Sequence, residues 1–266
     1  MQSPGDSRSK KQEASIHDSS FIIHDSGRKA DFGSPLGVIG RLLFAFVASQ
    51  LVAVVFIAFF WGLANFSTDL ENSAAAQFIY VLISEALAIG LVYFFLKLRD
   101  LSFRDIGLGR WPTWRDLKVG LVGFGVFYAI LIVSTIILAY LIPSFDVDQA
   151  QDVGFNSLNT SLDRLIAFVA LVLIPPVGEE ILMRGYLYTG LRSRLGFVWA
   201  MLITSVLFGL AHLEFGREAP VVWVAAVHTF ILSVVLVYVR ERTGALYAAI
   251  LLHVLNNAVA FMVHFL

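Results

Sequence analysis

The most constraining feature of this sequence is a series of apolar runs, each about as long as a membrane is thick. A spanning helix needs roughly 20 mostly apolar residues to cross a hydrocarbon core about 30 Å thick. Of the 266 residues, 58% are hydrophobic and only 15% are charged, so a soluble domain could not cover the apolar surface that results. We therefore expect an all-α, polytopic transmembrane helical bundle.

Seven runs approach the length of a span. They are residues 38–64, 75–96, 119–142, 165–188, 197–213, 221–239 and 245–266. The first is too long for the apolar core of a signal peptide and should remain as a span. The fifth and sixth are short, and Pro175-Pro176 should kink or break the fourth. The sequence thus predicts about seven spans.

Composition divides the chain into three parts. Residues 1–34 are polar and charged, so we expect a disordered tail. Residues 35–142 hold the first three spans, and residues 143–266 hold the last four. Cysteine is absent, which excludes disulfides, thiolate nucleophiles and cysteine-ligated metals. The net charge is -1 and no basic stripe stands out, which argues against a nucleic-acid partner.

Lysine and arginine indicate the orientation, because they are enriched in cytoplasmic loops. They gather in residues 1–34, in the segment between the second and third spans, and in the loops that follow the fourth and sixth spans. The loop after the first span has none, and the loop after the third has only Arg164. We therefore expect a multi-pass integral membrane protein with a cytoplasmic N-terminus and a C-terminus on the outer side.

The fourth span carries three ionisable residues, Glu179, Glu180 and Arg184. Charged groups within a bilayer are costly, so they usually pair, face the bundle interior and serve function. Glu180 and Arg184 are four residues apart and share a helix face, whereas Glu179 points about 100° away. One glutamate can thus be neutralised by arginine while the other stays free for a reactant. The alternative is that Glu180 and Arg184 form a purely structural salt bridge and that Glu179 is a protonated residue without a chemical role.

Two further spans carry histidines with a partner four residues away. Phe208 and His212 share a face near the end of the fifth span, and His253 and Asn257 share one in the seventh. Straight helices would separate His212 from the glutamates in depth, so tilt or a helix break must bring them together. His228 and His264 have no such partner, and we expect them to be structural.

These motifs carry a resemblance to a known family. Glu179-Glu180-x-x-x-Arg184, Phe208-x-x-x-His212 and His253-x-x-x-Asn257 resemble, in order and spacing, the signature of the CAAX prenyl protease and bacteriocin-processing (CPBP, abortive-infection) family of intramembrane proteases. The resemblance covers about residues 165–266. It implies a four-helix catalytic core in residues 143–266 and a glutamate-dependent endopeptidase whose substrate is a membrane-associated protein or peptide.

The motif residues can support peptide hydrolysis. A carboxylate in a low-dielectric pocket can take a proton from water, and Glu179 is the expected base, with His212 polarising the same water. Glu180 and Arg184 would fix the helix and the local charge, and His253 and Asn257 would donate hydrogen bonds to the oxyanion. A zinc variant would use Glu179, His212 and His253 as three ligands with one open position. The sequence does not choose between the two variants.

Two other functions are compatible with the sequence. A proton-coupled transporter would use Glu85 of the second span together with the Glu/His cluster as a relay, but the matching broken helices of such a carrier are not visible in the two halves of the chain. A catalytically silent scaffold or immunity protein on the same fold is the other alternative. For the substrate, the family resemblance implies either a prenylated C-terminal motif or a leader peptide.

Overall fold

The computed structural model describes residues 30–63, 73–142, 153–155, 157–213 and 223–265, and these contain helices and no strand. The α-helices are α2 (Pro35–Leu63), α3 (Ala74–Lys97), α4 (Trp114–Leu141), α5 (Ser161–Phe168), α6 (Ile174–Glu180), α7 (Tyr188–Arg192), α8 (Phe197–Ala211), α9 (Trp223–Thr243) and α10 (Tyr247–Phe265). Three short π-helical segments are η3 (Arg104–Leu108), η4 (Val169–Leu173) and η5 (Ile181–Leu187). The expected all-α class is confirmed.

The helices follow the seven apolar runs closely. Within the part of the chain that the structure describes, six helical segments are long and apolar enough to cross a membrane, and α8, with 15 residues, is a shorter apolar helix. The predicted number of spans is thus roughly right. The large exposed apolar surface of α2 and α4 is what a lipid-facing helix presents, and the chain is an integral membrane protein.

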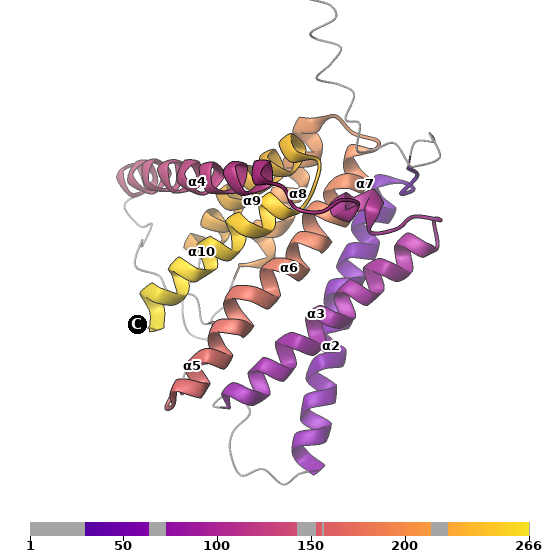
Figure 1. Ribbon diagram of the computed structural model, residues 1–266. Coiled ribbons are helices and arrows are strands. Elements are labelled where there is room, and N and C mark those ends of the chain that lie inside the picture. Colours follow the sequence, from indigo (N-terminus) through magenta and orange to yellow (C-terminus); the bar gives the residue numbers. More distant parts are fainter. Residues whose placement is uncertain (1–29, 64–72, 143–152, 156, 214–222, 266) are drawn as a thin grey trace, which may run out of the picture.

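One long helical rod, residues 161–192, runs through the middle of the bundle. It is built from α5, η4, α6, η5 and α7 in succession, and Figure 1 shows it as a continuous coral and orange ribbon. Pro175 and Pro176 lie in the first turn of α6, where a missing N–H is tolerated. The expected break therefore takes the form of a π-helical segment, η4, directly before the two prolines.

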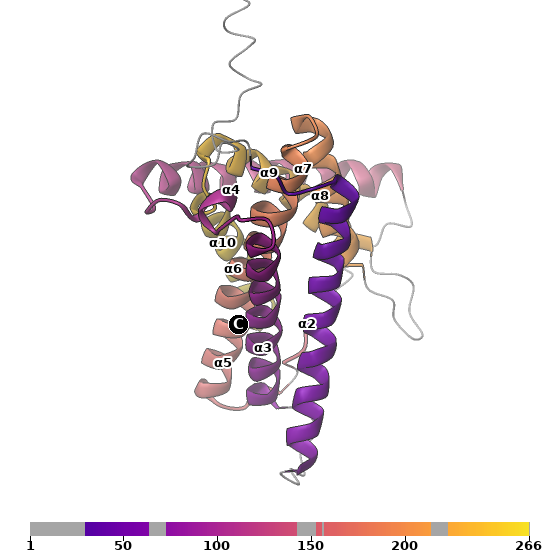
Figure 2. The same ribbon diagram turned by 90° about the vertical axis from the view of Figure 1, so that its right-hand side faces the viewer.

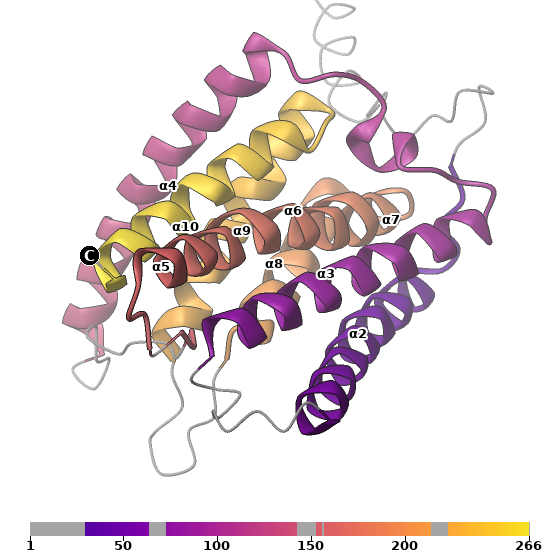
Figure 3. The same cartoon turned by 60° about the horizontal axis from the view of Figure 1, so that its bottom comes forward.

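The other helices cover the two sides of this rod. α3 packs on one side of α6 and α10 on the other (Figure 3). α2 packs on α3 (Figure 2) and also contacts η5 and α7 of the rod. α9 packs against α8, α4 and α10. α4 runs at a steep angle to α2 (Figure 1). The rod thus lies between the N-terminal pair of helices and the last helices of the chain.

Residues 30–34, the end of the expected tail, are packed against the bundle. Phe32 is 1% exposed, and its carbonyl accepts a hydrogen bond of 2.6 Å from Arg41, which also donates to the Tyr186 hydroxyl. Asp31 accepts a bond of 2.7 Å from Arg194, and this bond lowers the pKa of the Asp31 carboxyl. Residues 1–29 of the tail lie outside the described residues.

Glycine lets α4 approach its neighbours closely. A Cβ at Gly120 would lie 2.9 Å from the carbonyl oxygen of Ala248 in α10. A Cβ at Gly123 would lie 2.9 Å from side-chain carbons of Leu252 and Val239. Gly125, on the same helix, has no neighbour within 4 Å of such a Cβ. The face of α4 that carries Gly120 and Gly123 is therefore the one packed against α9 and α10.

We expect Gly120→Ala to destabilise the protein, because a backbone carbonyl cannot move aside as a side chain can. Overpacking of this kind costs about 1–3 kcal/mol. Gly125→Ala is the matched control and should be neutral or slightly stabilising, since alanine favours a helix over glycine. Thermal unfolding in detergent measures both. Equal melting temperatures for the two variants would contradict the packing described here.

Candidate active site

The sequence-predicted pair of Glu180 and Arg184 is formed and fully buried. Arg184 Nη1 lies 2.9 Å from Glu180 Oε1, and both side chains are 0% exposed. The guanidinium also lies over the ring of Phe208, with 4.4 Å between Cζ and the ring centroid. This cation–π contact ties η5 to α8. The prediction that Arg184 neutralises one of the two glutamates in the spanning helix is confirmed.

His253 joins the same carboxylate, a contact that sequence reasoning missed. Its Nδ1 lies 2.9 Å from Glu180 Oε1, the oxygen that also accepts from Arg184. A carboxylate only accepts hydrogen bonds, so Nδ1 is the donor, and the other ring nitrogen, Nε2, is left for other partners. The i,i+4 spacing of Glu180 and Arg184 could not reveal this, because His253 lies 73 residues further along the chain.

Glu179 lies on the other side of the His253 ring. Glu179 Oε2 is 3.7 Å from His253 Nε2, which is too long for a direct hydrogen bond. This oxygen is buried and has no hydrogen-bond partner among the described residues, while the side chain as a whole is 28% exposed. Glu179 is thus the partly accessible carboxylate and Glu180 the enclosed one, as the 100° separation on the helix predicts.

The ring of Phe208 connects His212 to His253. It makes edge contacts with both imidazoles, at centroid distances of 4.7 Å to His212 and 5.9 Å to His253. His212 Nδ1 lies 2.8 Å from the carbonyl oxygen of Phe208. The carbonyl only accepts, so Nδ1 donates this hydrogen bond, and Nε2 is left to accept a hydrogen bond from another group. The two histidines, which straight helices would have placed at different depths, are therefore gathered around one aromatic ring.

Asn257 lies one turn beyond His253 and is held by the central rod. Its Nδ2 donates a hydrogen bond of 3.0 Å to the carbonyl oxygen of Leu171 in η4. The side chain of Asn257 is half-buried. One N–H of its amide is thus engaged with the protein, and the amide nitrogen has a second N–H.

Glu85 of α3 is a further acidic residue close to Glu179. A Cβ on Gly178 would collide with the Glu85 carboxylate, so Glu85 lies directly against the glycine that precedes Glu179. The two carboxylates interact electrostatically. Sequence reasoning considered Glu85 only as part of a transporter relay. Its position in an otherwise apolar span was the available signal, since an intramembrane acid marks a functional site by default.

The proposed zinc ligands are not arranged as a metal site. The described residues contain no group of three or more His, Cys, Asp or Glu side chains that could hold a metal ion. Glu179 and His253 face each other, but His212 does not complete a three-ligand set with them. The side chains in this arrangement do not fit the zinc variant.

The two remaining spanning histidines lie outside the cluster. His228 Nε2 is 3.4 Å from the Thr135 hydroxyl, a contact between α9 and α4. His264 is exposed near the end of α10. Both positions are compatible with the structural role that the sequence indicated for them.

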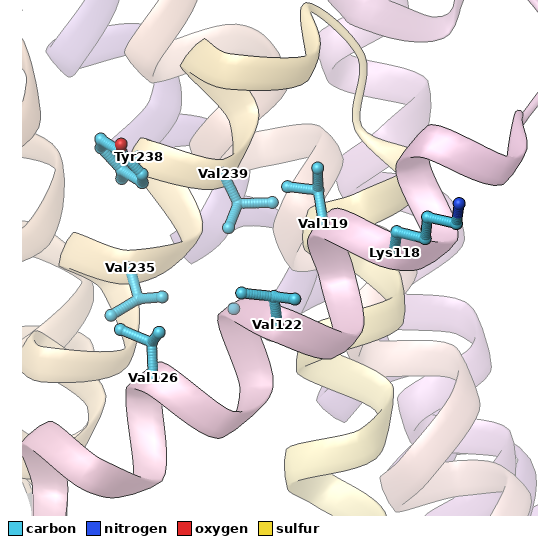
Figure 4. A pocket seen from close by; sticks show the side chains of 8 residues that line it. Lys118, Val119, Val122, Val126, Val235, Tyr238 and Val239 are labelled. Carbon is cyan, nitrogen blue, oxygen red and sulfur yellow. The ribbon is translucent and has the colours of Figure 1, made fainter.

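A groove between α4 and α9 is separate from the cluster. Figure 4 shows valine side chains of both helices facing each other across it. It is lined by Lys118, Val119, Val122, Gly123, Val126, Val235, Tyr238 and Val239. None of the motif residues lines this groove, and most of its walls are valine side chains, so it lies apart from the Glu/His cluster.

We expect Glu180→Ala to be a folding lesion as well as a functional one. It leaves Arg184 as an unpaired buried charge, which costs about 3–5 kcal/mol. Glu180→Leu combined with Arg184→Leu should be less damaging to stability than either single change, because no uncompensated charge remains. Glu179→Ala is the control, since Glu179 does not pair with Arg184. Thermal unfolding that is unchanged in Glu180→Ala would show that Arg184 finds another partner.

Comparisons with known proteins agree with the motif resemblance. Residues 161–259 match a family model described as Rce1-like, the type II CAAX prenyl endopeptidase Rce1-like family. No curated protein and no solved structure matches the chain. The match spans the central rod, α8, α9 and most of α10, which together carry all three motifs. The part of this membrane protein that holds the Glu/His cluster is therefore similar to the Rce1-like family, and the resemblance to CAAX-type intramembrane proteases is confirmed.

Proposed function

We propose that this chain is an intramembrane endopeptidase that hydrolyses a peptide bond with water activated by Glu179 and His212. The observation that carries the proposal is the arrangement of Glu179, Glu180 and His253. Glu180 holds one nitrogen of His253, and the other nitrogen faces the unpaired oxygen of Glu179 at 3.7 Å. Such an oriented carboxylate and imidazole can act on one small reactant between them.

In the proposed reaction, water donates one proton to Glu179 and is oriented by the free Nε2 of His212. The hydroxide oxygen bonds to the carbonyl carbon of the substrate, and the carbonyl oxygen becomes an oxyanion. His253, through Nε2, and the second N–H of Asn257 donate hydrogen bonds to it. The C–N bond then breaks as the proton on Glu179 passes to the leaving amine. The carbonyl re-forms, a carboxylic acid and an amine result, and Glu179 is regenerated as the carboxylate.

The proposed roles separate the two glutamates by their surroundings. Glu180 has its Oε1 occupied by Arg184 and His253, so it orients the site and does not exchange protons with substrate. Each glutamate has one buried oxygen without a hydrogen-bond partner among the described residues, but the side chain of Glu179 is 28% exposed whereas that of Glu180 is fully buried. A base must reach the proton that it removes, and of the two only Glu179 meets this requirement.

For the substrate, we propose a membrane-associated protein or peptide with a prenylated C-terminal CAAX motif. The family match supports this class, because its description names a CAAX prenyl endopeptidase. A leader peptide is the alternative that the sequence left open. A farnesylated CAAX peptide and the same peptide without the farnesyl group distinguish the two, since only a CAAX-type enzyme should require the lipid.

We also propose that the N-terminus lies in the cytoplasm and the C-terminus on the outer side. Basic residues from separate loops meet at one end of the bundle, which supports this orientation. Arg99 and Arg194 both contact Asp31, and Arg115 bonds to the carbonyl oxygen of Arg242. The proposed parts of the chain remain a tail over residues 1–34, N-terminal spans over 35–142 and a catalytic core over 143–266.

We predict that Glu179→Gln abolishes hydrolysis of the farnesylated peptide, with a loss on the order of 10²-fold or more. The change keeps the shape of the side chain but removes the basic oxygen. Melting temperature and expression should stay close to those of the unchanged protein. The readout is peptide release by purified protein in detergent.

A matched pair of histidine variants controls this experiment. His212→Ala should lower the rate, whereas His228→Ala, a spanning histidine outside the cluster, should not. Activity that survives in Glu179→Gln would reassign the base, first to Glu180. Absence of hydrolysis in the unchanged protein, with prenylated and leader peptides alike, would favour a silent scaffold instead.

A further inference from the structure

The two prolines of the central rod leave one backbone carbonyl without a helical donor. In an α-helix the carbonyl of Leu171 accepts from residue 175, and in a π-helix it accepts from residue 176. Both residues are prolines and carry no N–H. Ile174, the residue before them, donates to Val169 instead. The Leu171 carbonyl therefore has no partner from its own helix in either register.

Asn257 supplies the missing donor from α10. Its Nδ2 donates to Leu171 at 3.0 Å, and its Oδ1 accepts a bond of 3.3 Å from Nδ2 of Asn256. The Oδ1 of Asn256 in turn accepts from the hydroxyl of Tyr128, at 3.4 Å. The nitrogen of the Asn257 amide thus faces an acceptor, the Leu171 carbonyl, and its oxygen faces a donor, the Asn256 amide nitrogen. A carbonyl cannot donate, so the Asn257 amide cannot turn over without losing the bond to Leu171.

This chain of hydrogen bonds connects three parts of the bundle. Tyr128 comes from α4, the two asparagines from α10 and Leu171 from the central rod. Tyr128 is itself held by the rings of Phe124 and Phe127, at centroid distances of 4.9 and 5.0 Å. It also lies outside the segment that matches the family. A residue of the N-terminal spans therefore reaches Asn257 through one intermediate side chain.

We propose that Tyr128 and Asn256 are positioning residues, which together with the carbonyl exposed by Pro175 and Pro176 hold the Asn257 amide in the orientation that the reaction needs. One N–H of the amide is spent on Leu171, and the second stays available for the oxyanion. The inference rests on the proposed function for the use of that second N–H. The binding of Asn257 to Leu171 does not depend on it.

The positioning role is tested by Tyr128→Phe, with Tyr140→Phe as the matched control. Tyr140 lies on the same helix and is 84% exposed. Loss of the Tyr128 hydroxyl should lower kcat on the order of tenfold, since small misplacements of reacting groups are costly, and should change KM and melting temperature little. Tyr140→Phe should leave kcat unchanged. A kcat for Tyr128→Phe equal to that of the unchanged protein overturns the positioning role.

The origin of the Leu171 contact is tested by rescue. Asn257→Ala should lower the melting temperature by roughly 2–4 °C, because it leaves the Leu171 carbonyl without a donor. Pro175→Ala or Pro176→Ala restores a backbone N–H beside that carbonyl. At least one of them should raise the melting temperature of Asn257→Ala more than it raises that of the unchanged protein. If Pro175→Ala and Pro176→Ala each change the melting temperature by the same amount in Asn257→Ala as in the unchanged protein, the proposed contact is contradicted.

The rescued variant also separates this inference from the proposed function. If the second N–H of Asn257 serves the oxyanion, the double variant regains thermal stability but not kcat. Recovery of both would show that Asn257 only holds the helices together, and would overturn its part in the reaction. The thermal cycle needs no peptidase activity, so a failure of the proposed function would leave the test of the Leu171 contact intact.

Discussion

The candidate site depends on one buried oxygen, Oε1 of Glu180, which binds two partners at once. Arg184 and His253 both lie 2.9 Å from it. A buried carboxylate is costly unless it is paired and hydrogen-bonded, and here one oxygen meets both needs. The ion pair lies within the central rod, whereas the histidine bond joins the rod to α10. The same contact that makes the charge tolerable at membrane depth therefore also turns the imidazole toward Glu179.

The Pro175-Pro176 pair creates a second problem of the same kind. A carbonyl without a donor is expensive in lipid, because no water is present to bond to it. The π-helical segment before the prolines and the amide of Asn257 together satisfy the backbone there. The rod and α10 are thus joined twice, at Glu180 with His253 and at Leu171 with Asn257. Two attachments one helical turn apart on α10 restrict its rotation against the rod, which favours a fixed site geometry.

Much of this arrangement could be predicted from the sequence, because hydrophobic length and i,i+4 spacing are local properties. They predicted the helices and the Glu180–Arg184 pair. The contact between Glu180 and His253 could not be predicted from spacing, since it depends on how α10 lies on the rod. The position of Glu85 beside Gly178 depends likewise on how α3 packs. The hydrogen bond from Asn257 to the Leu171 carbonyl could not be predicted either. The adjacent prolines imply only that a side chain must donate to the carbonyl that lacks a helical partner.

The central chemical claim is that carboxylates and histidines alone activate the water. Peptide hydrolysis measured together with metal content, before and after extensive chelation, tests it most directly. We expect chelated protein with far less than one metal ion per chain to keep its full rate. A stoichiometric zinc ion in active protein, removed together with activity by chelation and restored together with it by added zinc, would contradict the account.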